Sequence, residues 1–203
     1  PKQRLWYIRA KEVVISSGSI ERPLVFGNND TPGVMLSSAA KEYLKIYGVL
    51  VGKKPLIFTN NDSGYETAIE FKKNGIDSIV LDTRKDSNSE IIKEAKDLNI
   101  NIKNSYVVVA AKGYKKVNSA DIAKISDDKK NISNIENIKC DCICVSGFWT
   151  PTIHLASQSG NKTKFNEEID AFIPSQSKQK ETTLGSANGI FTLEETLKTS
   201  FET

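Results

Sequence analysis

Apolar and polar positions form their clearest pattern between residues 55 and 82. An unbroken apolar run at 55–58 is typical of a short strand buried on both faces of a parallel sheet. A polar turn follows at 59–64, and apolar residues then recur with helical spacing as far as Lys73. A second short apolar run, 78–82, ends in an acid. The pattern therefore predicts a strand, a tight turn, a helix and a second parallel strand, which together form a βαβ unit.

The sequence on either side of this unit predicts further strands and helices. Strands are expected at 5–10, 12–16, 100–102, 140–146 and 171–174, helices at 37–47, 86–98 and 192–199, a hairpin at 106–125, and a loop at 127–137. Gly48 is expected to end the first helix. Residues 50–147 are therefore predicted to form one Rossmann-like α/β domain. The flanks, 1–36 and 148–203, are β-rich and lack a core of their own, so we expect them to pack together as parts of a second domain that the first one interrupts.

The turn after the first strand decides what the βαβ unit can bind. In units that bind dinucleotides, this turn carries the pattern G-x-G-x-x-G and brings backbone N–H groups and a helix N-terminus to a phosphate. Here Thr59, Asn61 and Gly64 stand at the three glycine positions. Asn61 tolerates a left-handed conformation, whereas the β-branched Thr59 does not. Either the unit has lost its nucleotide, or residues 59–63 bind a different ligand through side-chain hydrogen bonds.

Composition and charge exclude several classes of protein. Charged residues make up 26% of the chain and hydrophobic residues 38%, with a formal net charge of +3, which is too mild to indicate nucleic-acid binding. No apolar stretch approaches the roughly 20 residues of a membrane helix. No signal peptide is visible, so we expect a cytoplasmic protein. The first residue is Pro1 rather than Met, which leads us to expect a fragment of a longer polypeptide.

The three cysteines and the single histidine indicate no chemistry of their own. Cys140, Cys142 and Cys144 alternate along one predicted strand, which places them on one face, too close together for a tetrahedral metal cage and poorly arranged for a disulfide. We expect them to be small buried residues. His154 has no visible triad partner. The sequence therefore predicts no catalytic residue and no metal site.

Several motifs resemble those of the two-dinucleotide-binding-domain flavoproteins, the family of thioredoxin reductase and glutathione reductase, in which a second nucleotide domain is inserted into the first. Residues 13–19, with Arg22 and Pro23, resemble the strand that returns to the first cofactor. Asp141, Gly147 and Pro151 resemble the stretch that closes the inserted domain. Residues 185–189 stand where the family's last cofactor-contacting turn precedes a helix. The resemblance implies an inserted Rossmann-like domain between segments of an incomplete first FAD/NAD(P)-binding domain.

Within this group, residues 22–26, 28–35, 58–65 and 149–151 are similar to the alpha subunits of heterotetrameric sarcosine oxidases. That resemblance implies a flavoenzyme that oxidises sarcosine to glycine and formaldehyde, with oxygen as acceptor and tetrahydrofolate taking up the one-carbon unit. It also implies NAD in the first domain, FMN shared with a beta subunit, FAD in that partner, and further gamma and delta subunits. The alternatives are a subunit of a related amine or opine oxidase, and a non-catalytic scaffold that has lost nucleotide binding.

The resemblance and the turn chemistry together give the candidate cofactor contacts. Ser17, Gly18 and Gly185 would line what remains of the first cofactor site. Asp82 would take a ribose diol, with Arg84 nearby for a phosphate. The altered turn is our candidate for an FMN phosphate contact, through its hydroxyls, amides and helix N-terminus. Its residues are Thr59, Asn60, Asn61, Asp62, Ser63 and Gly64. Structural turns and a merely solvated acid are the alternatives.

Overall fold

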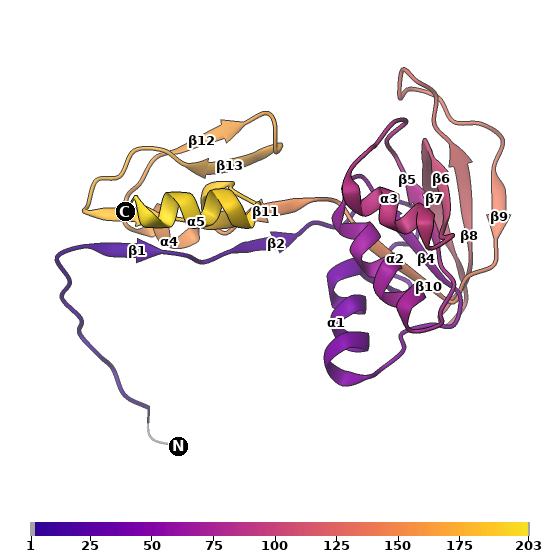
Figure 1. The fold of residues 1–203 in the computed structure, drawn as a ribbon, viewed down its shortest axis with the longest axis horizontal. Coiled ribbons are helices and arrows are strands. Elements are labelled where there is room, and N and C mark those ends of the chain that lie inside the picture. Colours follow the sequence, from indigo (N-terminus) through magenta and orange to yellow (C-terminus); the bar gives the residue numbers. More distant parts are fainter. Residues whose placement is uncertain (1–2, 203) are drawn as a thin grey trace. The chain divides into compact units, whose positions relative to one another are not determined.

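The computed structural model describes residues 3–202 and divides them into two compact units (Figure 1). The central unit comprises residues 21–148, and the flanking unit comprises residues 3–20 and 149–202. Residues 21–36, which the sequence pattern grouped with the flank, therefore lie in the central unit. One reason is that residues 34–36 form a strand that pairs with the end of the central unit's chain.

A five-stranded parallel sheet forms the middle of the central unit, with the strand order β3-β10-β4-β5-β6. Its strands are β3 (Val34–Leu36), β10 (Cys142–Ser146), β4 (Pro55–Thr59), β5 (Ile79–Asp82) and β6 (Asn101–Asn104). Every residue of β4 and β10 is buried. Such unbroken apolar runs are what a parallel sheet covered on both faces requires. The predicted βαβ unit is confirmed, with β4 and β5 paired in parallel.

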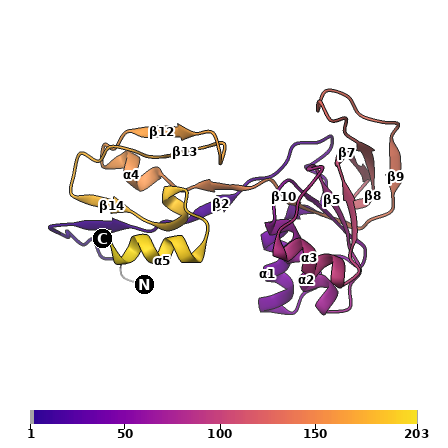
Figure 2. The same ribbon diagram turned by 45° about the horizontal axis from the view of Figure 1, so that its top comes forward.

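Helices cover one face of this sheet and a second sheet covers the other (Figure 2). The helices are α1 (Ser37–Tyr47), α2 (Ser63–Lys73) and α3 (Glu90–Asp97), and the second sheet is antiparallel, with β7 (Tyr106–Gly113), β8 (Val117–Lys124) and β9 (Glu136–Ile138). Neighbouring residues of β4 point to opposite faces, so that Ile57 packs under the helices and Phe58 packs against the second sheet. The two cores together hold the three layers.

Most predicted elements of the central unit are present, with shifted boundaries. Gly48 ends α1 in a left-handed conformation, φ 62°, as predicted. The predicted hairpin is β7 and β8. The predicted loop at 127–137 is partly wrong, because β9 begins at Glu136 and pairs with β8. α3 starts at Glu90 and not at 86, behind Ser89 in an extended conformation.

The flanking unit consists of short paired strands and helices around a thin core. β1 (Val13–Ile15) pairs in parallel with β14 (Glu181–Thr183), and β2 (Ser19–Glu21) pairs with β11 (Trp149–Pro151). β12 (Thr163–Asn166) and β13 (Ala171–Pro174) form a hairpin. The helices are α4 (His154–Gln158), η1 (Gly185–Asn188) and α5 (Leu193–Phe201). Few of its apolar side chains are buried, among them Ile15, Ala156 and Ile173. The expected strand near 171–174 and the expected C-terminal helix are both present.

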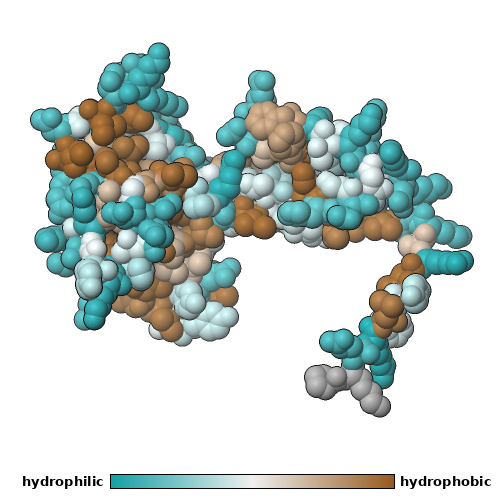
Figure 3. Space-filling view, turned by 180° about the vertical axis from the view of Figure 1, so that it is seen from behind, coloured by the Kyte–Doolittle hydropathy of each residue, from teal (hydrophilic) through white to brown (hydrophobic). Residues whose placement is uncertain are grey.

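The strand predicted at 5–10 is wrong. This segment has no regular structure, and the side chains of Leu5 to Ile8 are 73–90% exposed. They form the apolar part of the extended N-terminal segment in Figure 3. An alternating pattern folds as a strand only beside a partner, and no other strand within residues 3–202 pairs with it. Among the helices of that range, none is long and apolar enough to cross a membrane.

Candidate cofactor site

The candidate site of the central unit lies where three parallel strands end side by side. Thr59 at the end of β4 is in register with Ser146 of β10 on one side and with Asp82 of β5 on the other. Ligands of open α/β sheets bind outside such carboxyl ends. The turn from Thr59 to Gly64, followed by the first residues of α2, lies directly beyond them. The structure thus brings all the central candidates together at one edge.

The side chain of Thr59 packs directly against Gly64 at the start of helix α2. A Cβ atom added to Gly64 would lie 2.6 Å from Thr59 Cβ and 2.9 Å from Thr59 Cγ2. Gly64 is therefore required by the side chain of Thr59 itself. The Thr59 hydroxyl donates to the Asn61 carbonyl at 2.8 Å and accepts from the Asn61 N–H at 3.1 Å. These bonds close the turn on itself.

The side chain of Asn61 is hydrogen-bonded to the first residue of helix α2. Its Oδ1 accepts the backbone N–H of Ser63 at 2.8 Å, and its Nδ2 donates to the Ser146 carbonyl at 3.1 Å. The same Nδ2 donates to Oδ1 of Asn60, whose own N–H reaches the Ser146 carbonyl at 3.3 Å. The side chain of Asn61 is 5% exposed. One of the donors that a helix N-terminus offers to an anion is therefore already used by the protein.

Asp82 is fully buried and its carboxylate is saturated by neighbours. Oδ2 accepts from the Tyr65 hydroxyl at 2.7 Å and from Arg84 NH2 at 2.8 Å, and Ser87 Oγ approaches it at 3.4 Å. Oδ1 accepts the backbone N–H of Arg84 at 2.9 Å and its Nε at 3.1 Å. A carboxylate with these partners has no free oxygen for a ribose diol.

The guanidinium of Arg84 bridges two acids, since its NH1 contacts Asp62 Oδ1 at 2.8 Å while its other nitrogens hold Asp82. Burial alone would lower the pKa of Arg84, but its hydrogen bonds and charge interactions with Asp82 and Asp62 raise it overall. Burial, followed by the bond to Asp82, raises the pKa of the Tyr65 hydroxyl well above its ordinary value. Tyr65 stays neutral, so two carboxylates face one guanidinium and the group keeps an uncompensated negative charge.

The phosphate and ribose of a nucleotide, which this fold often binds at such a turn, would meet groups that are already bonded. A phosphate would meet the carboxylate of Asp62 and the Ser63 N–H already engaged by Asn61. A ribose would meet the saturated carboxylate of Asp82. The residues at this edge therefore do not fit a dinucleotide or an FMN phosphate in this arrangement.

The flanking unit places its own three candidates together. β1 and β14 run in parallel with Ile15 opposite Thr183, and each strand leads within three residues to a glycine, Gly18 or Gly185. Both glycines adopt left-handed conformations, φ 75° and 62°. No atom lies within 4 Å of the position that a Cβ on Gly18 would take, so its backbone is open. The hydroxyl of Ser17 donates to the Thr152 carbonyl at 2.7 Å and holds the turn.

Sequence reasoning missed two members of the central group, Tyr65 and Ser146. Tyr65 belongs to the buried face of α2, and helical spacing could have placed it in the core, but not beside Asp82. Ser146 is a fully buried polar residue at a strand end, next to a turn already singled out. That combination was the available signal.

The cysteines are buried thiols, as predicted, but they do not share one face. Cys142 and Cys144 pack under the helices with their Sγ atoms 3.7 Å apart, whereas Cys140 precedes β10 and packs on the other side of the sheet. Burial raises the pKa of the Cys140 thiol to about 12. Between residues 3 and 202, no group of three or more His, Cys, Asp or Glu side chains is arranged to hold a metal ion.

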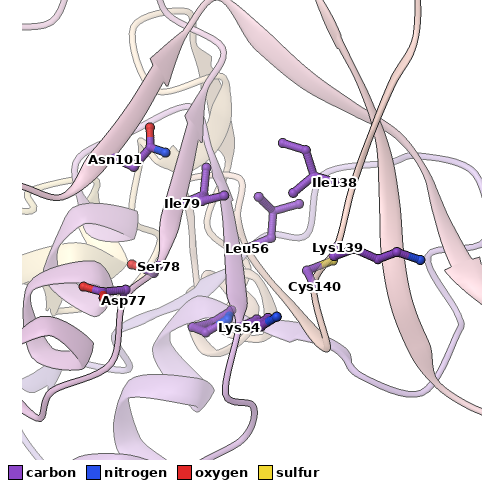
Figure 4. A pocket seen from close by; sticks show the side chains of 10 residues that line it. Lys54, Leu56, Asp77, Ser78, Ile79, Asn101, Ile138, Lys139 and Cys140 are labelled. Atoms are coloured by element: carbon purple, nitrogen blue, oxygen red, sulfur yellow. The ribbon is translucent and has the colours of Figure 1, made fainter.

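A cavity of about 240 Å³ opens at the other edge of the parallel sheet, near the amino ends of β4, β5 and β6. Figure 4 shows Leu56 and Ile79 on that sheet and Ile138 on the facing strand. Cys140 and Lys54 also line it. The cavity contains none of the predicted cofactor contacts.

Comparison with solved structures defines the class of fold. The thioredoxin reductase of T. acidophilum superposes with a TM-score of 0.72 at 16% identity, over 92% of this chain and 61% of that one. L-Proline dehydrogenase from P. horikoshii gives a TM-score of 0.57 at 22% identity, over 88% of this chain and 30% of that one. The chain has the fold of FAD/NAD(P)-binding oxidoreductases, and the predicted fold class is confirmed. No protein-family model matches the chain.

Comparison with curated proteins identifies the relatives within that class. The sarcosine oxidase alpha subunit of Corynebacterium sp. (strain U-96) is 31% identical over 202 residues, which cover 100% of this chain and 21% of that protein. The alpha subunit from Rhizobium meliloti (strain 1021) is 35% identical over 174 residues, 85% of this chain and 16% of that one. The chain is therefore related to the sarcosine oxidase alpha subunits, as its motifs predicted. It spans 21% or less of the length of these relatives.

Proposed function

We propose that this chain is part of a flavin-dependent oxidoreductase of the sarcosine oxidase type. The observation that carries the proposal is the 31–35% identity to sarcosine oxidase alpha subunits over 85–100% of the chain. The oxidoreductase fold supports it independently. The reaction is the oxidation of sarcosine to glycine and formaldehyde, with oxygen as acceptor and tetrahydrofolate receiving the one-carbon unit.

The proposed assembly contains several subunits and cofactors. The relatives are named as alpha subunits, which supports the presence of partner chains. We assign NAD to the first dinucleotide-binding domain of this subunit, FMN to its contact with a beta subunit, and FAD to that partner. Gamma and delta subunits complete the heterotetramer. Electron transfer then depends on the partners, and this chain contributes cofactor contacts and subunit contacts.

Within this proposal, the flanking unit supplies the NAD contacts through Ser17, Gly18 and Gly185. Two parallel strands end side by side here, which is where α/β sheets bind ligands. Each strand is followed by a glycine whose left-handed backbone allows close approach of a ligand. The open space beside Gly18 is the feature that the central turn lacks.

The first experiment assays the protein purified in its native assembly. Sarcosine should drive oxygen consumption and release glycine and formaldehyde, and the formaldehyde should fall when tetrahydrofolate is added. Proline, other N-methyl amino acids and an opine serve as competing substrates. Faster turnover of one of these compounds would show that the substrate is a related amine or opine and not sarcosine. Absence of bound flavin from the assembly would refute the oxidoreductase proposal.

The second experiment tests the NAD contacts with a matched pair of variants. Gly18→Val and Gly75→Val introduce a side chain at two glycines with nearly equal conformations, φ 75° and 77°, and with no atom within 4 Å of either added Cβ. Both variants should be destabilised to a similar extent by backbone strain. Only Gly18→Val should lower the NAD content of the purified protein. An equal NAD content in the two variants would refute the assignment.

A further inference from the structure

We infer that the central unit is a Rossmann-like unit closed to nucleotides by its own side chains, with Asn61 and Arg84 engaging the groups that a cofactor's phosphate and ribose would use. The fold of the unit leads one to expect a nucleotide at the β4–α2 turn. The residues present there disagree with that expectation. This inference concerns the central unit alone and does not depend on the substrate proposed above.

Side chains occupy the turn that a phosphate would approach. A nucleotide phosphate approaches the turn where the second glycine position leaves the backbone bare, while the third glycine allows the helix to pack closely on the strand. Here the side chain of Thr59 lies against Gly64, with its Cβ 2.6 Å from the position of an added Cβ. The first position thus carries a fully buried threonine, and the second carries the side chain of Asn61 where a phosphate would need bare backbone.

The hydrogen-bond donors and acceptors at the turn are also engaged by the protein itself. The Ser63 N–H at the start of α2 is bonded to Asn61 Oδ1, and Asn61 Nδ2 is bonded to the neighbouring strand end. The acid at the end of β5, Asp82, is bonded to Tyr65 and Arg84. The recognition groups of a nucleotide site are present, but they satisfy one another.

The charges around the turn also oppose a phosphate. Asp62 and Asp82 flank a single guanidinium, so a phosphate entering the turn would approach an excess of negative charge. Arg84 cannot turn toward a phosphate without leaving the fully buried carboxylate of Asp82 with no opposite charge. The arrangement therefore opposes an anion and at the same time links the turn, helix α2 and strand β5.

The direct test is an amide NMR titration of the full chain with NAD+, with FMN and with pyrophosphate, each at millimolar concentration. The amide signals of Asn61, Ser63, Gly64 and Tyr65 should stay in place with all three compounds. A saturable shift of these signals, abolished in Asn61→Leu, would overturn the inference. Shifts confined to the flanking unit would agree with it, because they report a different site.

A second test measures whether the side chains stabilise the unit as a ligand would. Arg84→Met and Asn61→Leu should each lower the melting temperature of the ligand-free chain by roughly 5 °C or more, since each leaves buried polar groups unpaired. Lys72→Met is the matched control, because it breaks an exposed pair with Asp77 outside the network and should change little. If Arg84→Met does not fold, Tyr65→Phe replaces it as the milder change. An Arg84→Met or Tyr65→Phe variant as stable as the Lys72→Met control would overturn the inference.

Discussion

Replacing Gly64 by alanine tests whether Thr59 is what makes this glycine necessary. The added Cβ would lie 2.6 Å from Thr59 Cβ, 2.8 Å from Oγ1 and 2.9 Å from Cγ2, all closer than real Cβ contacts. Gly64 has a helical backbone within α2, so alanine brings no strain of its own. Overpacking of this kind costs about 1–3 kcal/mol of the free energy of unfolding.

The sign of the effect should reverse when Thr59 is removed. In a Thr59→Gly background all three close atoms are gone, and Gly64→Ala should then stabilise α2 by about 0.5–1 kcal/mol, because alanine is the better helix former. The effect of Gly64→Ala on the free energy of unfolding should thus differ by roughly 2 kcal/mol or more between the two backgrounds, which a double-mutant cycle resolves. Thr59→Ala is the control, since it keeps the Cβ at 2.6 Å and should give little relief.

Urea unfolding followed by circular dichroism gives the four free energies of unfolding, with the slope of each curve as the check that only stability has changed. Thr59→Gly itself will be destabilised, because it loses the hydrogen bonds to Asn61, but the cycle compares Gly64→Ala within each background. An equal cost of Gly64→Ala in the presence and absence of Thr59 would show that another contact excludes the side chain.

Three further predictions concern other side chains of the central unit. Tyr65→Phe should cost about 1.5–3 kcal/mol by removing the hydrogen bond to Asp82, as measured by urea unfolding near pH 7. The pKa of Tyr65 is raised in the folded state, so the stabilisation by its hydroxyl is fully present below the ordinary tyrosine pKa of about 10 and should fall as the pH rises above it. The difference in free energy of unfolding between wild type and Tyr65→Phe should therefore become smaller above that pH. Asp141→Ala should cost about 1–2 kcal/mol, because this carboxylate accepts two backbone N–H groups of the loop before β4, each at 2.8 Å, and Asp141→Asn should not restore the loss. The thiol of Cys140, its pKa raised by burial to about 12, should resist a thiol reagent at pH 8 and react in urea together with the other two cysteines, whereas labelling of the folded chain would contradict its burial.

The central unit could be predicted from the sequence because its signals are local. The apolar run of β4 and the helical spacing of α2 each fix an element without reference to the rest of the chain. The partners of the site side chains could not be predicted in this way. The hydroxyl of Tyr65 meets an acid 17 residues away, and that contact depends on how α2 packs on β5. Residue type placed Asp82 at a strand end, but only the packing shows that its carboxylate is already bonded.

The flanks were harder to predict because an isolated strand pattern does not fold by itself. Residues 5–10 and 12–16 carry similar patterns, yet only the second contains a strand, because Val13–Ile15 finds β14 as a partner from the far end of the chain. The turn at Ser17 and Gly18 depends on the same long-range pairing. Its candidate contacts rested on a resemblance to known proteins and not on periodicity.

The turns at Gly64 and Gly18 differ in what occupies the space beside them, and this difference bears on the proposed cofactor contacts. Beside Gly64 the space is filled by Thr59, and the polar groups around it are bonded to one another. Beside Gly18 the space is open, and its left-handed backbone is one that glycine adopts without strain. An open left-handed glycine leaves room for a ligand without requiring one, since Gly75 has the same conformation and the same open space. We therefore propose the cofactor contact at the Gly18 turn, where the backbone is open, and a packing role for the Gly64 turn.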